Sequence, residues 1–409
     1  MISPGTTKQR PVVILQVLLA IVLIGMVTVS PHRLLYDEPL HLEAAKALSG
    51  GMTIHQMLLT PFSSAPGPLY PVLHSALSPL THLNAPWVRY VNLVLLFCVI
   101  ACVAFSFKCI HADDSWLAAG MILAIPMTWV TAGMALTEIP ALLMASLALL
   151  VAVWATRGSQ ASWKSYAGFM ASGLFAGLSI VGRQTYLPIV LAFAAIAVVA
   201  PRWRLQSILA FAIAGAVPIP VFITWHGLTP PAQRQVGGSI VLEHGLLAFA
   251  YLAIVVAILA PQYYATKWRL SLLVFALGFL VNLVLIRFQW TVAVGIADRL
   301  PGVLRQWYSI ACGSLLIALL VGFLSSTVTN VWKRRSDHLF LLMTLEATLL
   351  TATAFGITHL FSSRYVMASF PFVFGMTQPF FKPSRWTIVL GASGAALGCA
   401  SLSTYYWGH

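Results

Sequence analysis

Residues 36–71 read YDEPLHLEAAKALSGGMTIHQMLLTPFSSAPGPLYP and interrupt an otherwise apolar chain. The acidic pair Asp37 and Glu38 precedes Pro39, and proline suits the first turn of a helix because its missing N–H would be unpaired there in any case. We therefore expect a helix from Pro39 onward, with Glu38 as its N-cap and Asp37 just outside it. Gly50 and the glycine after it form the expected stop.

The expected helix is amphipathic. Its apolar side consists of Leu40, Ala44, Ala47 and Leu48. Glu43 and Lys46 lie on another side, so we expect the helix to rest flat on a membrane surface. His41 follows Asp37 by four residues, and one helical turn brings its imidazole near the carboxylates. The Pro-Gly-Pro run at residues 66–68 then forces an irregular turn.

The composition indicates a membrane protein. Apolar residues make up 59% of the chain and charged residues 8%, a balance that excludes a soluble globular domain of this length. The formal net charge of +13 does not indicate a nucleic-acid partner, because Lys and Arg stand singly between apolar runs and form no stripe. Five cysteines lie in or beside the apolar runs without a CxxC pair, which favours packing roles over disulfides or a metal site.

Apolar runs long enough to cross a bilayer predict an all-α polytopic bundle of about thirteen transmembrane helices. The expected spans begin near Pro11, Trp87, Ser115, Thr137, Lys164, Gln184, Arg204, Val241, Trp268, Leu304, His338, Tyr365 and Trp386. The first run, which ends at Val29, is longer than the apolar core of a signal peptide and lacks a small-residue cleavage site. We expect it to be retained as a span.

Basic residues are distributed unequally between the connections. With a cytoplasmic N-terminus, most of the 23 Lys and Arg fall on the cytoplasmic side, in every second connection. The Tyr36 loop then faces outward, to the periplasm or to the lumen of the endoplasmic reticulum. Arginine on the outer side is costly unless something pairs with it. The outer arginines are Arg33, Arg89, Arg183, Arg234, Arg287, Arg299, Arg305 and Arg364.

Two isolated acidic sites each have two readings. Asp37, at the mouth of a membrane protein, is a general base if it reaches an acceptor hydroxyl, or a helix cap, the commonest use of an acidic residue before proline. Glu138, in Thr137-Glu138-Ile139-Pro140, opens an apolar span. It either caps the positive end of that helix or, if buried, pairs with an arginine or holds a polar network.

Short polar segments also place arginines between apolar runs. Gly182-Arg183-Gln184-Thr185 is either a turn with a snorkelling side chain or a phosphate clamp, because a guanidinium offers a planar fork of donors to phosphate oxygens. Arg364, in the segment from His359 to Tyr365, reads on its own as an interfacial anchor. Asp298 and Arg299 read as a solvated pair.

Six of these segments, in this order, resemble the dolichyl-phosphate-glucose alpha-1,2-glucosyltransferase family, which adds the terminal glucose to the dolichol-linked oligosaccharide. The segments are Tyr36-Asp37-Glu38 with His41, Pro66-Gly67-Pro68-Leu69-Tyr70, Val88-Arg89-Tyr90-Val91-Asn92, Thr137-Glu138, Arg183-Gln184-Thr185 and Arg364-Tyr365. That family belongs to the GT-C class of multispanning glycosyltransferases, which use polyprenyl-phosphate sugars as donors. The similarity is strongest over the first third of the chain, and Pro68 interrupts the family's Pro-Gly-Leu-Tyr pattern.

The resemblance implies a GT-C-like bundle that transfers a sugar, a hexose such as glucose, from a polyprenyl-phosphate donor to a lipid-linked or cell-envelope glycan. It implies an inverting reaction in which Asp37 is the catalytic base and Glu38 and His41 orient it or the acceptor. The whole chain would form one integral membrane domain, with residues 31–86 as an extracytoplasmic catalytic loop and residues 87–409 supplying the remaining helices.

The leaving lipid phosphate needs fixed positive charge in a partly dry site. The resemblance makes Arg183 and Arg364 the first candidates for that role, followed by Arg299 and Arg305, and it places Glu138 at the floor of the pocket. Gln184, Tyr365 and Tyr70 complete the expected substrate-binding set. The donor carries a single phosphate, so the sequence requires neither a metal ion nor another cofactor.

Two other classes fit the same chain. A lipid-linked sugar flippase or other secondary transporter would also have many spans and arginines facing a cavity, but no pair of related halves is visible. A non-catalytic membrane subunit would use the acidic pair as a cap and the arginines as anchors. Compact loops and the absence of any Asn-x-Ser/Thr motif favour a bacterial inner membrane over the endoplasmic reticulum.

Overall fold

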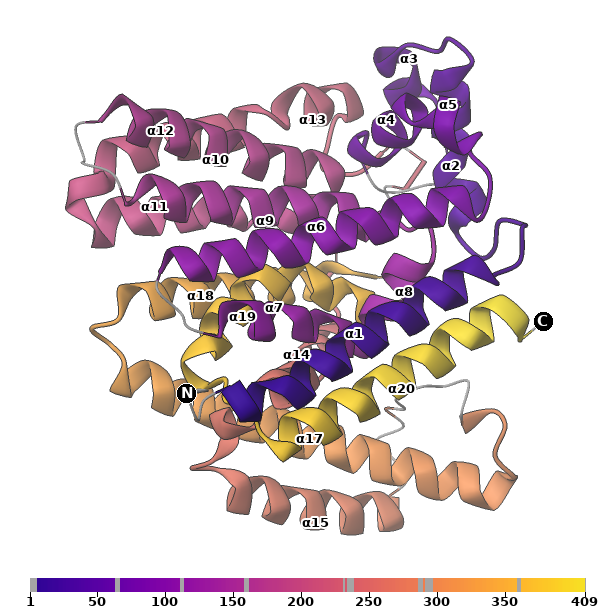
Figure 1. The fold of residues 1–409 in the computed structure, drawn as a ribbon, viewed down its shortest axis with the longest axis vertical. Helices are drawn as coiled ribbons and strands as arrows, with labels where there is room; N and C mark the ends of the chain where they lie inside the picture. Colours follow the sequence, from indigo (N-terminus) through magenta and orange to yellow (C-terminus); the bar gives the residue numbers. More distant parts are fainter. Residues whose placement is uncertain are drawn as a thin grey trace.

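The computed structural model is helical, and no β-strand occurs in the ranges that it describes (Figure 1). These ranges are residues 6–62, 67–110, 114–157, 162–230, 232–233, 239–285, 290, 297–358 and 362–408. Helices satisfy their backbone hydrogen bonds internally, which is what a chain needs inside a lipid bilayer. The expected all-α class is confirmed.

Within the described residues, nine helices are long and apolar enough to cross a membrane. Eight are α1 (Thr6–Thr28), α6 (Trp87–Cys109), α9 (Glu138–Ala155), α10 (Trp163–Gly182), α14 (Leu242–Leu259), α17 (Gly302–Lys333), α18 (His338–Ala352, continued by η6, Thr353–Gly356) and α20 (Arg385–Trp407). The ninth, Pro201–Trp225, joins η3 (Pro201–Trp203), α12 (Arg204–Ala216) and α13 (Ile219–Trp225). A tenth is counted if one bent pair is a single span.

The bent pair consists of α7 (Ser115–Gly120) with η1 (Met121–Ala124), followed by α8 (Pro126–Gly133). The two parts meet at an angle of 75°. Pro126 lacks the N–H that would continue the helix, and Ile125 before it is extended, as a residue before proline prefers. The indole nitrogen of Trp129 donates to the Leu123 carbonyl at 2.9 Å, which satisfies one acceptor that the break frees.

Three further expected spans have shorter helices. One comprises η2 (Gln184–Tyr186) and α11 (Ile189–Val199), the second is α15 (Trp268–Leu285), and the third comprises η7 (Ser363–Ser369), α19 (Phe370–Thr377) and η8 (Gln378–Phe380). The third passes through the protein core, where Val366, Met367 and Phe370 have no exposed surface. Hydropathy does not distinguish such a segment from one that faces lipid, so the expected number of about thirteen exceeds the number of complete spans.

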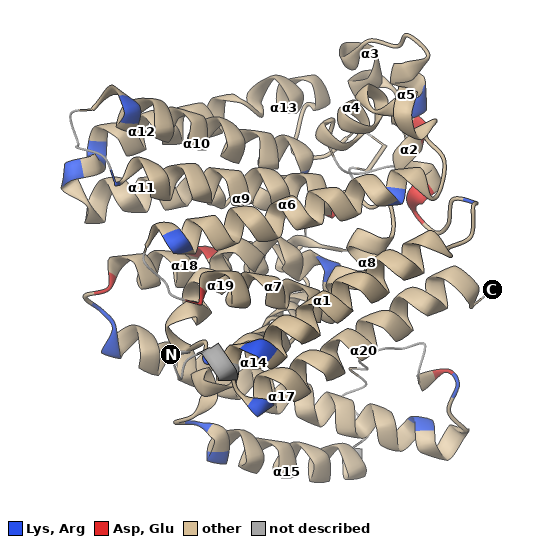
Figure 2. Cartoon of the chain, viewed as in Figure 1, with Lys and Arg blue, Asp and Glu red and all other residues tan. Residues whose placement is uncertain are grey.

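Figure 1 shows the helices in layers. The upper layer contains α6 and α9–α13, the middle contains α1, α8, α14 and α18–α20, and the lower contains α15 and α17. Small residues allow close contact within a layer: a Cβ at Gly173 of α10 would lie 2.5 Å from the Ala210 carbonyl of α12. Lys and Arg lie largely at helix ends and connections, several of them at the left of Figure 2.

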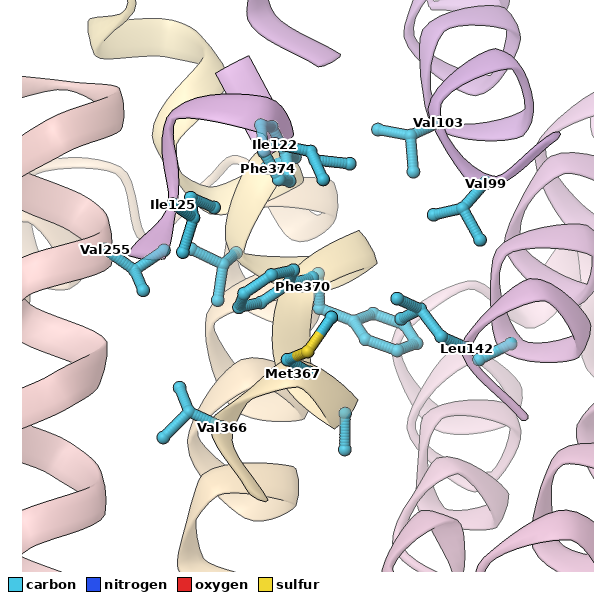
Figure 3. Close-up of a cluster of buried hydrophobic side chains, with 14 of the residues drawn as sticks. Val99, Val103, Ile122, Ile125, Leu142, Val255, Val366, Met367, Phe370 and Phe374 are labelled. Carbon is cyan, nitrogen blue, oxygen red and sulfur yellow. The ribbon is translucent and has the colours of Figure 1, made fainter. Parts of the chain in front are cut away.

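A central cluster of buried apolar side chains joins the middle and upper layers (Figure 3). Val99 of α6, Leu142 of α9, Val255 of α14 and Phe370 of α19 all have no exposed surface. Because η7 and α19 thread through this cluster, packing fixes the position of Arg364, which lies in the first turn of η7.

The segment between α1 and α6 forms a cap of short helices at one end of the bundle (Figure 1). They are α2 (Glu38–Ser49), α3 (Ile54–Leu59), α4 (Leu69–Ala76) and α5 (Ser78–Thr81). Helix α2 ends before Gly50 as predicted. The expectation that Glu38 is the N-cap residue of α2 was wrong, because Asp37 occupies that position. The expected apolar side is confirmed only in part: Ala44 is buried and packs with Leu48, but Leu40 is exposed. Leu42 and Ala45 are buried instead, in a cluster with Tyr70 of α4, so helix α2 buries one side against protein.

Candidate active site

The site begins at the turn that leads into α2. Tyr36 has a left-handed backbone (φ 53°), which is rare for a bulky residue and marks a constrained turn. Asp37 follows, but its carboxylate makes no capping hydrogen bond. Its Oδ2 instead lies 3.1 Å from Nη2 of Arg364. Of the two readings of Asp37, the structure removes the side-chain cap.

Glu138, the first residue of α9, joins two arginines. Its Oε1 lies 2.9 Å from Nη1 of Arg183 and 3.3 Å from Nε of Arg364. Nη1 of Arg183 also donates to Oγ1 of Thr137 at 2.7 Å. The expectation that a buried Glu138 pairs with arginine is confirmed. Its second oxygen, Oε2, is buried and has no hydrogen-bond partner among the described residues.

Arg183 is held by the turn that ends α10. Its backbone is extended, and Gly67 donates a backbone hydrogen bond of 3.1 Å to the carbonyl of Gly182 beside it. A Cβ at Gly67 would lie 1.8 Å from the carbonyl oxygen of Val181, so only glycine fits there. The Arg183 side chain is 13% exposed, which places it inside the protein and excludes a snorkelling role.

Aromatic rings border both guanidinium groups. The ring of Tyr365 lies 5.8 Å from Arg183 and 5.9 Å from Arg364, and the ring of Tyr36 lies 5.9 Å from Arg364. Attraction between a cation and a ring face favours this arrangement. Burial opposes the charge of Arg364, but the carboxylates of Glu138 and Asp37 raise the pKa of this guanidinium. Gln184, which follows Arg183, is half-buried.

His41 lies one turn into α2 and is 7% exposed. Burial lowers the pKa of its imidazole from 6.5 to about 4, and the charges of Glu138 and Asp37 oppose this shift only in part. His41 is therefore neutral at pH 7. The site charges are then two carboxylates, Asp37 and Glu138, and two guanidinium groups, which balance one another.

Two expected site residues lie behind the cluster. Glu38 points away from Asp37 and forms an ion pair of 2.7 Å with Arg89, in which neither side chain has any exposed surface. Tyr70 is 1% exposed, and its hydroxyl donates to the Ala135 carbonyl at 2.6 Å. Neither Glu38 nor Tyr70 lines the two cavities described below.

Two further candidates lie on the surface. Arg305, near the start of α17, pairs with Asp298 at 2.8 Å, and both side chains are more than half exposed. Asp298 thus pairs with Arg305 instead of its neighbour Arg299, which is also exposed. No described ion pair or hydrogen bond joins either arginine to the cluster. Arg234, Arg287 and His359 lie outside the described residues.

Two cavities reach the cluster. The larger, of about 120 Å³, is bordered by Arg364 and Tyr36 and is called the Arg364 cavity. Its apolar wall is made of Pro126, Met127, Val130, Ile254 and Leu397. The smaller, of about 30 Å³, is bordered by His41 and Thr137 and is called the His41 cavity. Its apolar wall includes Met57, Leu58, Phe62 and Trp225.

The sequence did not single out all residues at these cavities. Thr137 was seen only as part of the Glu138 motif, yet it bonds Arg183 and lines the His41 cavity. Tyr405, near the end of α20, lines the Arg364 cavity and lies 5.0 Å from the ring of Tyr36. No local pattern marks Tyr405, because it reaches the site only through the packing of α20.

Among the described residues, no group of three His, Cys, Asp or Glu side chains could hold a metal ion. All five cysteines are free. The polar side chains that line the two cavities include Arg364, His41 and several hydroxyl-bearing residues, and the carboxylates of Asp37 and Glu138 lie beside them through their ion pairs with Arg364. This set can bind an anion and accept a proton.

No protein-family model matches the sequence, and no curated protein matches it. Two solved structures are similar to the chain: ArnT from Cupriavidus metallidurans in the apo state and the same protein bound to undecaprenyl phosphate. The identity is 14% in both cases, with TM-scores of 0.41 and 0.43. The matches cover 95% and 94% of this chain and 77% of the ArnT chain.

Proposed function

We propose that this chain is a GT-C class glycosyltransferase that moves a sugar from a polyprenyl-phosphate donor to a glycan acceptor. The observation that carries the proposal is the state of Asp37. Its carboxylate caps no helix, is 25% exposed and is held by Arg364 between residues that border two separate cavities.

The Arg364 cavity suits the donor. Its wall of Met127, Val130 and Ile254 is apolar, as a polyprenyl chain requires, and Arg364 offers a cation to the phosphate at one edge. The break at Pro126 opens this wall, since α8 turns away from η1 by 75°. Arg183, which shares Oε1 of Glu138 with Arg364, provides the second cation.

The His41 cavity suits the acceptor, which enters past Trp225 and Met57 and meets the neutral His41. The acceptor hydroxyl oxygen attacks the anomeric carbon of the donor sugar and forms the new glycosidic bond. The bond from that carbon to the phosphate oxygen breaks, and its electrons stay on the phosphate. The hydroxyl proton moves to Asp37. Attack from the face opposite the leaving group inverts the anomeric centre, and no covalent enzyme intermediate is needed.

The charge balance of the cluster supports this step. The donor is a phosphodiester with one negative charge, and the released polyprenyl phosphate gains a second. Asp37 loses its charge when it takes the proton, so Arg364 is freed from that ion pair as charge grows on the phosphate. Fixed cations directed at developing charge are typically the largest contribution to catalysis.

The finer assignments complete the proposal. The transferred sugar is a hexose, with glucose as the first choice, and the acceptor is a lipid-linked or cell-envelope glycan. Residues 31–86 form the extracytoplasmic catalytic loop of a single membrane domain, in a bacterial inner membrane with a cytoplasmic N-terminus. The first three of these assignments follow the resemblance described above, and the orientation follows the distribution of Lys and Arg.

One experiment separates the enzyme from a lipid-linked sugar flippase. The purified protein is reconstituted into vesicles with polyprenyl-phosphate glucose and a lipid extract of the source cell, and both the lipid products and the leaflet of the donor are measured. A transferase releases polyprenyl phosphate and forms a new glycoside. Movement of intact donor between leaflets without any new glycoside would replace this proposal with the transporter.

A further inference from the structure

We propose that Arg89 and Asn92, which lie on one face of α6, are positioning residues that set the placement of Asp37 relative to Glu138. This inference rests on the proposed function, because it assigns these side chains a role in that reaction. Neither residue borders the Arg364 cavity or the His41 cavity among the described lining residues. Their effect on the chemistry is therefore indirect.

Arg89 joins the end of α1 to the start of α2. Its Nε and Nη2 donate to the two oxygens of Glu38 at 2.8 and 2.7 Å. Nη1 donates to Oγ of Ser30 at 2.7 Å and to the Pro31 carbonyl at 2.8 Å, and Nη2 also donates to the Arg33 carbonyl at 2.8 Å. All three nitrogens of this fully buried guanidinium are used to hold the chain that leads into Asp37.

Glu38 carries the connection on to α9. Its Oε2 accepts from the backbone of Leu35 at 2.7 Å, and its Oε1 accepts from the backbone N–H of Ala135 at 2.8 Å. The carbonyl of the same Ala135 accepts from Tyr70 at 2.6 Å. Both backbone polar groups of Ala135, its N–H and its carbonyl, are thus held by side chains, three residues before Glu138.

Asn92 fixes the same segment from the next turn of α6. Residues three apart lie on one helix face, and Nδ2 of Asn92 donates to the carbonyls of Met134 at 2.8 Å and Leu136 at 2.9 Å. Asn92 has no exposed surface. The turn that bears Asp37 is therefore bonded to Arg89, and the segment that bears Glu138 is bonded to Asn92. These two residues lie on adjacent turns of the single helix α6.

The placement matters because Arg364 spans both carboxylates at once. Its Nη2 lies 3.1 Å from Asp37 and its Nε lies 3.3 Å from Glu138. If either segment moves by about 1 Å, the guanidinium can no longer contact both, and a misplacement of that size costs about 100-fold in turnover. A network with only a stabilising role would leave turnover unchanged in any variant that folds.

The test uses Asn92→Leu as its main variant, since Arg89→Ala would leave Glu38 as an uncompensated buried charge and is expected to unfold. Leucine has the same branching and the same number of side-chain heavy atoms, and the Met134 carbonyl keeps its bond from the backbone of Leu136. We expect kcat to fall about 10- to 100-fold while the donor Kd stays within about twofold. Ser106→Ala removes a buried hydroxyl from the other end of α6 and is expected to keep native kcat.

Arg89→Lys provides an independent arm. Lysine keeps the buried charge opposite Glu38 but cannot reproduce the fork of bonds to Ser30, Pro31 and Arg33. We expect a folded protein with lowered kcat and native donor Kd. Native kcat in folded Asn92→Leu or Arg89→Lys would overturn the positioning role. If Asp37→Asn in the same assay keeps native kcat, the proposed function fails instead, so the two failures are distinguishable.

Discussion

Arg364→Met removes the side chain that bridges the two carboxylates of the site, Asp37 and Glu138. Methionine keeps much of the apolar length of the side chain but offers no donor. Arg364 is only 16% exposed and lies 327 positions from Asp37 in the sequence. Its loss leaves Asp37 and Glu138 with Arg183 as the remaining arginine of the cluster.

The consequence for the reaction is a loss of charge stabilisation at the leaving phosphate. Removal of one preorganised donor from developing charge costs about 100- to 1,000-fold in the rate of the chemical step, or about 3 to 4 kcal/mol. Asp37 and Glu138 also lose the cation that they share, so the two carboxylates are no longer held by one side chain.

The assay is single-turnover release of polyprenyl phosphate, with the native protein and Arg364→Met in parallel. Arg335→Met is the matched control, because Arg335 is exposed and its guanidinium lies 5.2 Å from the ring of Trp332, in a part of the chain outside the site. A single-turnover rate within about threefold of native for Arg364→Met would refute the assignment of Arg364 to the leaving phosphate.

Three other predictions concern the cap and its junction with α10. The folded state holds His41 with a pKa of about 4 against 6.5 when exposed, so the unfolded state binds the proton first. The free energy of unfolding therefore falls as pH drops from 6.5 toward 4, by at most about 3 kcal/mol. An unfolding temperature in detergent that does not change with pH in this window would contradict this prediction. His74 is fully buried, and neither ring nitrogen has a described hydrogen-bond partner. His74→Phe should therefore raise the unfolding temperature through a gain of about 1 kcal/mol in the free energy of unfolding. A lower unfolding temperature would mean that the imidazole has a polar partner. Gly67→Ala places a methyl group against the Val181 carbonyl. It should displace the turn that holds Arg183 and so weaken donor binding. The control is Gly215→Ala, where a Cβ meets nothing within 4 Å, and its donor Kd should stay native. Equal donor Kd values in the two variants would exclude an effect of Gly67 on donor binding.

The sequence predicted those parts of the fold that depend on local pattern. Apolar length located the membrane-spanning helices, and Gly50 marked the end of α2. Hydropathy wrongly predicted a complete membrane span from Tyr365 onward, because this apolar run is short and is buried in protein instead of lipid. It also placed Leu40 on the buried side of α2, where the structure exposes it, because contacts with α3 and α4 decide which side is covered.

The site was predicted in part for the same reason. Asp37, Glu138, Arg183 and Arg364 are polar residues that interrupt apolar runs, so each was visible, and the structure brings all four together. Their mutual distances depend on packing across most of the chain. Sequence adjacency did not show where the Glu38 side chain lies: helical geometry turns it away from Asp37 and toward Arg89.

The central claim is that Asp37 takes the proton from the acceptor hydroxyl. The most direct measurement is turnover of Asp37→Asn together with its donor Kd, with Asp114→Asn as a control because Asp114 contacts Gln9 at 2.7 Å, away from the cluster. The account predicts that Asp37→Asn forms no detectable glycoside, stays folded and still binds donor, while Asp114→Asn keeps native turnover. Native turnover by Asp37→Asn would contradict the account.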